Sequence, residues 1–413
     1  MNFIDELKWR GLIQDISDEK KFLAFAEAKG GLYIGFDPSF KSIHLGNYQT
    51  LMVLKRAVEC GHKAYGLVGS ITGMIGDPKP SIERQMQAKE VIEQNVVALT
   101  KQLSKYVKFD KFFSNIDFYA NMKVWDFLRD IGKLVSVNYL LEKEVIARRL
   151  EHGISYAEFS YTLLQGYDFL HLYEEENVIC QSGGSDQWGN IVTGLEMIRK
   201  SHGTDAKACC FSIPLLLKPD GTKFGKSEGG AIYLDPELTS PYTMYQFLLS
   251  QPDSMIETML KRFTFLDEET IGKIIAEHKS EPSKFYGQKV LAKTVVTDIH
   301  GADEANKSIK ISDALFSGNM SALSSDELYD ALSGTNVFTA TKKEYPTYEL
   351  LVEAKICKSN SEARKLIEQK GISLNGKALD KNDTTITANN SIDNKFSYIK
   401  RGKKDYTLIK WFN

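Results

Sequence analysis

The first half of the chain alternates short apolar runs with segments whose apolar residues recur at helical spacing. The apolar runs, which predict strands, lie at residues 31–36, 62–70, 107–113 and 177–184. The amphipathic segments, which predict helices, lie at residues 45–60, 85–105, 159–176 and 188–203. This alternation predicts an α/β fold, a parallel sheet with helices on both faces. Because ligands of such sheets bind at the carboxyl ends of the strands, the polar residues there are candidates for chemistry.

The second half has a different pattern. Residues 240–333 read mainly as helices, and the last segment predicts two short helices at 347–354 and 359–370. Asn375-Gly376 follows them, a dipeptide that favours a tight hairpin turn. The expected domains are a parallel-sheet domain at 1–235, a helical domain at 236–334, a linker at 335–345 and a small α+β domain at 346–413.

Composition narrows the class of protein. The chain is 42% hydrophobic and 26% charged, as in ordinary globular proteins. No apolar run approaches the length of a membrane span, and the charged N-terminus has no signal-peptide core. The five cysteines have neither metal-ligand spacing nor a disulfide framework, so we expect a cytoplasmic protein that holds no metal through them.

The small net charge of −2 hides an asymmetry. Residues 346–413 hold 13 Lys and Arg against 8 Asp and Glu, whereas the remaining 345 residues hold 39 against 46. A basic tail on an acidic body suggests that the tail meets a polyanion such as RNA, the alternative being an ordinary solvated surface.

Two glycine-containing segments carry the candidate chemistry. At the first predicted helix, His44 and Asn47 are one turn apart and flank Gly46, at a helix start that attracts anions. The second, "PDGTKFGKSEGG" at residues 219–230, differs from a P-loop. Only three residues separate its first two glycines, and the glycines and proline that follow disfavour a helix.

Together these segments resemble the two signatures of class I aminoacyl-tRNA synthetases, His44-Leu45-Gly46-Asn47 and Lys223-Phe224-Gly225-Lys226-Ser227. The motifs "LYIGFDPSFKSIHLGN", "GDP", "SYTLLQGYDFL", "GGSDQWGNI" and "DGTKFGKS" resemble, in order, those of bacterial tyrosyl-tRNA synthetases. The likeness covers essentially the whole chain, and its tail resembles an S4-type RNA-binding module. The resemblance implies a Rossmann-like catalytic domain, a helical domain and a small S4-like domain.

The resemblance also implies roles for particular residues. The implied catalytic residues, which contact the phosphates of ATP, are His44, Asn47, Lys223, Lys226 and Ser227. The implied tyrosine-binding residues are Tyr33, Asp77, Tyr161, Gln165, Asp168 and Gln187, with Asn115 supporting the pocket. The implied nucleotide-binding residues are Gly35, Asp37, Ser39, Gly46, Thr50, Gly184, Asp186 and Lys226. The implied RNA-binding residues are Lys358, Arg364 and Lys365.

One set of these residues also stands out by spacing. Tyr161, Gln165 and Asp168 form one polar stripe on an otherwise apolar helix. Polar groups on a buried helix need partners, either within the protein or on a substrate. In the family, Tyr33 and Asp168 bond the phenol hydroxyl of tyrosine, and the rest of the stripe with Asp77 holds the amino group.

The implied partners are L-tyrosine, ATP with Mg²⁺ and tRNA(Tyr), with no tightly bound cofactor and no membrane, in a homodimer. The sequence departs from the family in three places. Asn47 replaces a second histidine that many members have, and Ile34 replaces a smaller residue. "GDPKPSIER" is one residue shorter than the common pattern, which leaves Lys79 and Arg84 as candidates for the basic residues of that loop.

Three alternatives stay open. A tryptophanyl-tRNA synthetase has a similar fold, but the pair Tyr33 and Asp168 and the S4-like tail count against it. A related nucleotidyltransferase would share the His44 segment, but it would not combine an RNA module with the second signature, residues 223–227, which we call the lysine loop. A catalytically silent RNA-binding paralogue would not need its chemical positions filled. Amino-acid-dependent exchange of pyrophosphate into ATP separates all three.

Overall fold

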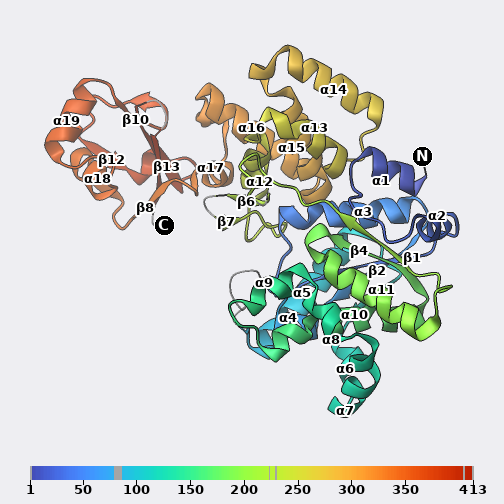
Figure 1. The fold of residues 1–413 in the computed structure, drawn as a ribbon. Helices are drawn as coiled ribbons and strands as arrows, with labels where there is room; N and C mark the ends of the chain where they lie inside the picture. The colour runs from blue at the N-terminus through green and yellow to red at the C-terminus, as the bar shows by residue number, and fades with distance from the viewer. Residues whose placement is uncertain (1, 79–85, 223, 228–229, 403–404, 412–413) are drawn as a thin grey trace. The chain divides into compact units, whose positions relative to one another are not determined.

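The computed structural model describes residues 2–78, 86–222, 224–227, 230–402 and 405–411. The chain forms two compact units (Figure 1). The first unit comprises Met1–Leu238 and Pro252–Glu281, and the second comprises Thr239–Gln251 and Pro282–Asn413. No helix in the described part of the chain has the length and apolar character that a membrane span needs.

The first unit is built on a five-stranded sheet. Its strands are β1 (Gly31–Phe36), β2 (Lys63–Val68), β3 (Lys111–Ser114), β4 (Val178–Gly184) and β5 (Cys209–Ile213). Their order is β3-β2-β1-β4-β5, and every neighbouring pair is parallel, which confirms the predicted parallel sheet. The chain moves outward from β1 in one direction and from β4 in the other, so the strand order reverses between β1 and β4. Such a reversal opens a crevice at the carboxyl ends of the two strands.

Helices cover both faces of this sheet, as predicted (Figure 1). The helices of the first unit are α1 (Phe3–Trp9), α2 (Glu19–Glu27), α3 (Tyr48–Glu59), α4 (Ser70–Ile75), α5 (Lys89–Tyr106), α6 (Ile116–Tyr119), α7 (Val124–Asp126), α8 (Val137–Leu141), α9 (Glu144–Leu150), α10 (Tyr156–Glu176), α11 (Trp188–His202), α13 (Asp253–Phe263) and α14 (Glu268–Ser280). Helices α3 and α5 pack on β2 from one side. Helices α10 and α11 pack on the other side, in a core with Tyr33, Tyr65 and Phe169.

The ends of α10 show why the sequence folds locally as it does. Ser155 caps the helix by accepting a hydrogen bond from the backbone N–H of Glu158 at 3.1 Å. The helix ends at Glu176, and the left-handed backbone of the next residue, Asn177 (φ 53°), turns the chain directly into β4. Asparagine tolerates this conformation better than most residues. The two caps therefore fix both ends of α10, and with them the positions of its polar residues Tyr161, Gln165 and Asp168.

The first unit differs from the sequence prediction in two strands. The sequence pattern does not predict β5, because its run Cys209–Ile213 is short and lacks alternation of apolar and polar residues. β3 begins at Lys111, whereas the prediction placed a strand over residues 107–113. Residues 107–110 instead form the turn into β3, where Asp110 donates its backbone N–H to the carbonyl of Ala64.

The second unit joins helices to a second sheet. Its helices are α12 (Pro241–Leu249), α15 (Tyr286–His300), α16 (Ala302–Ser317), α17 (Ser325–Leu332), α18 (Thr347–Glu353) and α19 (Asn360–Glu368). Its strands are β8 (Asn336–Ala340), β9 (Glu344–Pro346), β10 (Ile372–Leu374), β11 (Lys377–Ala378), β12 (Thr385–Thr387), β13 (Phe396–Arg401) and β14 (Asp405–Trp411). The sheet order is β11-β10-β13-β14-β8, and β12 pairs separately with β9.

The tail confirms its predicted helices and hairpin but corrects the linker. Asn375 and Gly376 both have positive φ, 48° and 84°, and connect β10 to β11 as a tight turn. Residues 335–345 were predicted as a linker, yet β8 within them pairs in parallel with β14. β8 is short and is buried on one side only, so the sequence pattern does not indicate a strand there. Its only neighbour in the described sheet is β14, the last strand of the chain.

The structure also divides the helical region differently. The predicted helical domain at 236–334 contains α13 and α14, which belong to the first unit, whereas α12 and α15–α17 belong to the second. In the second unit, Leu328 and Leu332 of α17 share one hydrophobic cluster with Tyr398 and Leu408 of the tail sheet. The helices and the small sheet domain are therefore joined through a common core.

Candidate active site and RNA-binding surface

The crevice between β1 and β4 gathers most of the residues that the sequence singles out. β1 and β4 are paired as far as Ile34 and Ser182, and the chains separate beyond those residues. The loop after β1 leads to His44, and the turn after β4 carries Asp186 and Gln187. Polar residues of α10 and α4 lie beside the same crevice, because α10 packs on both α4 and β4.

One end of the crevice holds a buried carboxyl group with neutral partners. Asp168 is almost fully buried and accepts hydrogen bonds from Asn115 Nδ2 at 3.0 Å and from the Tyr119 hydroxyl at 3.1 Å. Burial raises the pKa of Asp168 to about 7, against the lowering effect of these two hydrogen bonds. Asn115 is itself held by the backbone N–H of Ile71, which its Oδ1 accepts at 2.9 Å.

The Tyr33 hydroxyl lies in the same region. Tyr33 is 1% exposed, and burial followed by the nearby Asp168 carboxylate raises its pKa well above the usual value. Its hydroxyl has no hydrogen-bond partner among the described residues. A buried hydroxyl without a partner costs about 1–3 kcal/mol, so this group is suited to an outside ligand. A phenol is both donor and acceptor, and can bond a hydroxyl and a carboxylate together.

The stripe on α10 continues toward a second polar cluster. Tyr161 is buried, and Gln165 Oε1 is buried with no hydrogen-bond partner in the described part of the chain. Asp77 accepts hydrogen bonds from Gln187 Nε2 at 2.8 Å and from Asn190 Nδ2 at 3.1 Å. Burial raises the pKa of Asp77 to about 6. This end of the crevice therefore offers a carboxylate and amide oxygens, the groups that suit an ammonium ion.

The first signature is held in a defined shape. His44 precedes a 3₁₀ turn at Leu45–Asn47, and its Nδ1 accepts the backbone N–H of Gly46 at 3.0 Å. This bond fixes the orientation of the imidazole ring. Asn47 is exposed at the start of α3, and its carbonyl accepts the hydroxyl of Thr50. Helix α3 therefore points its N-terminus, with its positive partial charge, toward solvent at this edge.

The two signatures touch each other. A Cβ atom on Gly225 would lie 2.5 Å from the backbone N of Gly46, and one on Gly46 would lie 2.8 Å from the carbonyl O of Phe224. Gly225 also has a positive φ of 91°. Both positions therefore require glycine, since only glycine lets the two backbones approach this closely. Further along, the backbone N–H of Leu45 donates to the carbonyl of Ile232 at 2.7 Å.

The second signature is described only in part. Phe224 is 2% exposed, and the backbones of Lys226 and Ser227 form β6 (Lys226–Ser227), which pairs with β7 (Gly230–Ala231). This strand confirms that no helix of the P-loop kind begins at Lys226. Lys223 lies outside the described residues, and so do Lys79 and Arg84 of the shortened loop.

The remaining nucleotide candidates surround the same edge. Gly35 is exposed within a buried strand, and a Cβ atom there would meet only a Leu67 side-chain carbon, at 4.0 Å. Asp37 accepts hydrogen bonds from the backbone and hydroxyl of Ser39. At the end of β4, a Cβ atom on Gly184 would lie 2.7 Å from an oxygen of the exposed Asp186. Glycine therefore leaves room for this carboxylate beside the strand end.

The structure also brings in residues that the sequence reasoning missed. The Tyr119 hydroxyl donates a hydrogen bond to Asp168. Asn190 donates to Asp77 through Nδ2 and accepts at Oδ1 from the hydroxyl of Thr162 at 2.8 Å, so it links these two residues. Asn190 lies inside the "GGSDQWGNI" motif, which was a usable signal. Tyr119 lies in a segment without clear periodicity, and nothing in its local sequence marks it.

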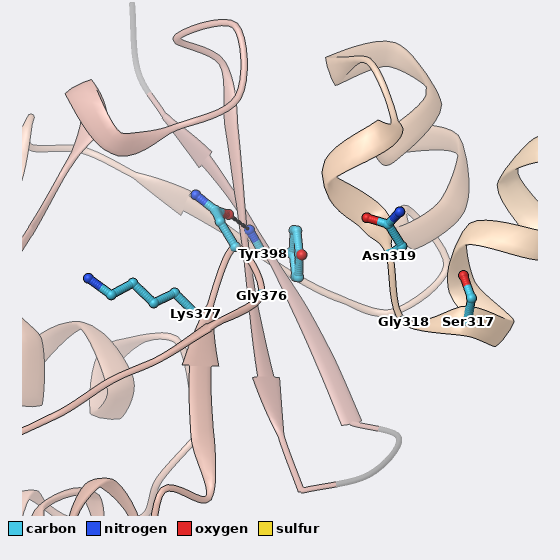
Figure 2. Close-up of a pocket in the computed structure, with 7 residues that line it drawn as sticks. Ser317, Gly318, Asn319, Gly376, Lys377 and Tyr398 are labelled. Carbon is cyan, nitrogen blue, oxygen red and sulfur yellow. Dashed lines mark hydrogen bonds between the residues drawn. The ribbon is translucent and has the colours of Figure 1, made fainter.

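The tail presents its basic residues to solvent. Lys358, Arg364 and Lys365 are all exposed, and the Arg364 guanidinium lies 5.6 Å from the centre of the Tyr348 ring. Beside the Asn375-Gly376 turn the second unit is hollowed, with a cavity of about 530 Å³ (Figure 2). The cavity is lined by Ser317, Gly318, Asn319, Asn375, Gly376, Lys377 and Tyr398. Its lining is mostly amide, hydroxyl and backbone groups, and the Lys377 ammonium extends away from it.

Comparison with known proteins decides the family. Residues 26–317 match the family described as class I tRNA synthetases (W and Y), and residues 327–409 match the tyrosine–tRNA ligase SYY-like C-terminal domain. The chain is 46% identical over 411 residues to the tyrosine–tRNA ligase of Ureaplasma parvum, covering 99% of both chains. The chain belongs to the tyrosine–tRNA ligases.

Other relatives of the family agree. Tyrosine–tRNA ligase 2 of Bacillus cereus is 43% identical over 417 residues, covering 99% of this chain and all of the relative. The truncated mitochondrial tyrosyl-tRNA synthetase of Aspergillus nidulans has a TM-score of 0.69 at 29% identity, covering 76% of this chain and 94% of that structure. Tryptophanyl-tRNA synthetase of Plasmodium falciparum shares the fold, with a TM-score of 0.55 at 14% identity. The tyrosine-type C-terminal domain removes the tryptophan alternative.

Proposed function

We propose that this protein activates L-tyrosine with ATP and transfers the tyrosyl group to tRNA(Tyr). The observation that carries the choice of amino acid is the Tyr33 hydroxyl beside Asp168, which is buried and has no hydrogen-bond partner in the described ranges of the chain. The phenol hydroxyl of tyrosine would donate to the Asp168 carboxylate and accept from Tyr33. Phenylalanine would leave the buried Tyr33 hydroxyl without a partner and would give Asp168 no hydrogen bond beyond those from Asn115 and Tyr119, which opposes its binding.

The amino group of tyrosine would lie at the other end of the pocket. Asp77, Gln165 and Tyr161 offer oxygen atoms there, and an ammonium ion needs three acceptors. Gln187 holds the Asp77 carboxylate through its amide and stands at the turn after β4. The substrate carboxylate would then point out of the crevice toward the two signatures, where ATP would bind.

The first step would need no general base. The tyrosine carboxylate is already ionised at neutral pH. One of its oxygens would attack the α-phosphorus of ATP, and the bond to the β-phosphate would break to release pyrophosphate. Catalysis would rest on positioning and charge stabilisation, with His44 and Asn47 at one side of the phosphates and Lys223, Lys226 and Ser227 at the other. ATP would enter as its magnesium complex.

The second step would transfer the tyrosyl group. A hydroxyl of the terminal ribose of tRNA would attack the adenylate carbonyl carbon, and AMP would leave. Lys358, Arg364 and Lys365 would contact tRNA phosphates, in a salt-dependent interaction. The amide and hydroxyl groups of the hollow beside the Asn375-Gly376 turn suit base edges better than phosphates.

The protein would act as a cytoplasmic homodimer. Seven large apolar side chains between residues 124 and 156 are exposed, a concentration that favours a protein interface. They are Val124, Trp125, Leu128, Val137, Leu141, Leu150 and Tyr156. A second copy of the chain is the expected partner, as the family resemblance implies.

A two-stage experiment tests the function. The full-length protein is incubated with tyrosine, ATP and pyrophosphatase, and the protein-bound adenylate is isolated by gel filtration. Addition of a tRNA(Tyr) transcript should then yield tyrosyl-tRNA and AMP in equal amounts. Absence of a protein-bound adenylate, or its failure to react with tRNA, would contradict the proposal.

A further inference from the structure

One buried aromatic residue outside the signatures contacts the second signature and the residue that directly follows the first. Phe263, the last residue of α13, is 1% exposed. Its ring centre lies 5.3 Å from that of Tyr48 and 5.7 Å from that of Phe224. Tyr48 directly follows Asn47 of the first signature, and Phe224 directly precedes Gly225 of the second. These two contacts therefore sit immediately beside the point where the signatures touch.

The end of α13 is held by two buried arginines. Arg10 donates to the carbonyls of Lys261 at 2.7 Å, Thr264 at 3.0 Å and Leu266 at 2.9 Å. Arg56 donates to the carbonyls of Arg262 and Thr264. The unpaired carbonyls at a helix C-terminus carry negative partial charge, so two guanidinium groups bind them well.

The Arg56 guanidinium keeps its charge despite burial. Burial lowers the pKa of Arg56 to about 9, with the neighbouring Arg10 adding to the effect. Glu6 forms an ion pair with Arg10 at 2.5 Å and lies 3.7 Å from Arg56. The Arg56 guanidinium is thus charged at neutral pH. Because Arg56 belongs to α3, the cluster ties the end of α13 to the helix that begins at the first signature.

We propose that Phe263 is a positioning residue for tyrosine activation. It holds Phe224, and with it the lysine loop, against the His44–Asn47 turn. The Arg10–Arg56 cluster fixes α13 in the position that the contact between Phe263 and Phe224 requires. The inference rests on the proposed function, because it assigns the lysine loop to the phosphates of ATP. Its consequence is specific: loss of the Phe263 ring should affect the ATP end of the reaction and spare the tyrosine pocket.

The test compares Phe263→Ala and the milder Phe263→Leu with a matched control, Ile256→Ala. Ile256 is fully buried on the same helix, two turns earlier, roughly 10 Å along its axis. Each purified protein is assayed for tyrosine-dependent pyrophosphate exchange, well below its own melting temperature. Tyrosine affinity is measured separately by calorimetry without ATP.

Phe263→Ala should lower kcat and raise the KM for ATP, together reducing kcat/KM by on the order of 10²-fold, as for a misplacement of about 1 Å. Phe263→Leu should show a smaller change in the same direction. Tyrosine affinity should stay within about twofold of wild type in all variants, and Ile256→Ala should keep its kinetics. Phe263→Leu is also combined with Phe224→Leu in a double variant. Its loss of kcat/KM should not exceed that of the more affected single variant, because the two rings act through one contact.

Several results would overturn the inference. Wild-type kinetics in both Phe263 variants would do so, and so would an equal loss in Ile256→Ala, which would mark a general effect of core packing. Additive losses for Phe224→Leu and Phe263→Leu would show that the two rings act independently. A wild-type protein without tyrosine-dependent exchange would instead contradict the proposed function, so the two failures are distinguishable.

Discussion

Replacing Asp168 by Asn removes one buried carboxyl group and nearly preserves the shape of the side chain. Burial raises the pKa of this group to about 7 in the folded protein. The ordinary pKa of an unfolded aspartate is about 3.9. Between about pH 4 and about pH 7, the folded protein therefore keeps a proton on Asp168 that the unfolded chain has released.

The sign of the effect follows from the raised pKa. The contribution of Asp168 to the free energy of unfolding is greatest below about pH 4 and is lost as the pH rises to about 7. Each pH unit in that window corresponds to about 1.4 kcal/mol. From about pH 5 to about pH 8, wild-type protein should thus lose about 3 kcal/mol that the Asp168→Asn variant keeps.

The surrounding groups do not obscure this comparison. The pKa values of Tyr33 and Tyr119 are raised well above the usual tyrosine value, so neither titrates in this window. Asp77, with a pKa of about 6, does titrate in the window, but it is present in both proteins and cancels in their difference. The pH dependence of the hydrogen bond from Asn115 is already contained in the pKa of Asp168, because this bond is one of the interactions that set it.

The assay is urea unfolding, followed by circular dichroism at about pH 5, 6, 7 and 8, for both proteins. The difference in the free energy of unfolding between Asp168→Asn and wild type should move by about 3 kcal/mol in favour of the variant between the two extremes. A difference that stays constant across these pH values would refute the assignment of a raised pKa to Asp168, whatever the absolute stabilities.

The remaining predictions concern the other parts of the account. Lys226→Ala should lower both kcat and kcat/KM for pyrophosphate exchange by about 10²–10³, with unchanged tyrosine affinity; a normal single-turnover rate would remove the loop from the mechanism. Reversing the charges of Lys358, Arg364 and Lys365 to Glu should leave exchange intact and weaken tRNA charging at low tRNA. The salt dependence of tRNA binding should fall by about one unit of slope per lost contact, whereas an unchanged slope would exclude these residues from the interface. Trp125→Glu should convert a dimer to monomers in analytical ultracentrifugation; a variant that sediments as wild type does would place the interface elsewhere.

Helices and turns were predictable from the sequence where residues close together in the chain determine them. The stripe of Tyr161, Gln165 and Asp168 follows from helical spacing, and α10 does carry it. The Asn375-Gly376 turn follows from the backbone preferences of those two residues, and the hairpin is present. In both cases the chain within a few residues determines the outcome, so periodicity and turn chemistry were sufficient.

Contacts between distant segments were not predictable from the same signals. Nothing near Gly46 or Gly225 in the sequence indicates that their backbones meet. Arg10 belongs to the charged N-terminal segment, yet it binds carbonyls more than 250 residues away. The local pattern at residues 335–345 predicts a linker because the partner of β8, strand β14, lies at the opposite end of the tail. Such pairings depend on packing of the whole unit, which spacing along the chain does not encode.

The central claim is that the pocket at Tyr33 and Asp168 selects tyrosine by its hydroxyl. The most direct measurement is pyrophosphate exchange into ATP by the full-length protein with tyrosine, phenylalanine or tryptophan as the only amino acid. Phenylalanine cannot form the hydrogen bond to Asp168. This loss alone should make its kcat/KM roughly 10- to 150-fold lower than that of tyrosine, and tryptophan should support no exchange. Equal kcat/KM values for tyrosine and phenylalanine would contradict the account.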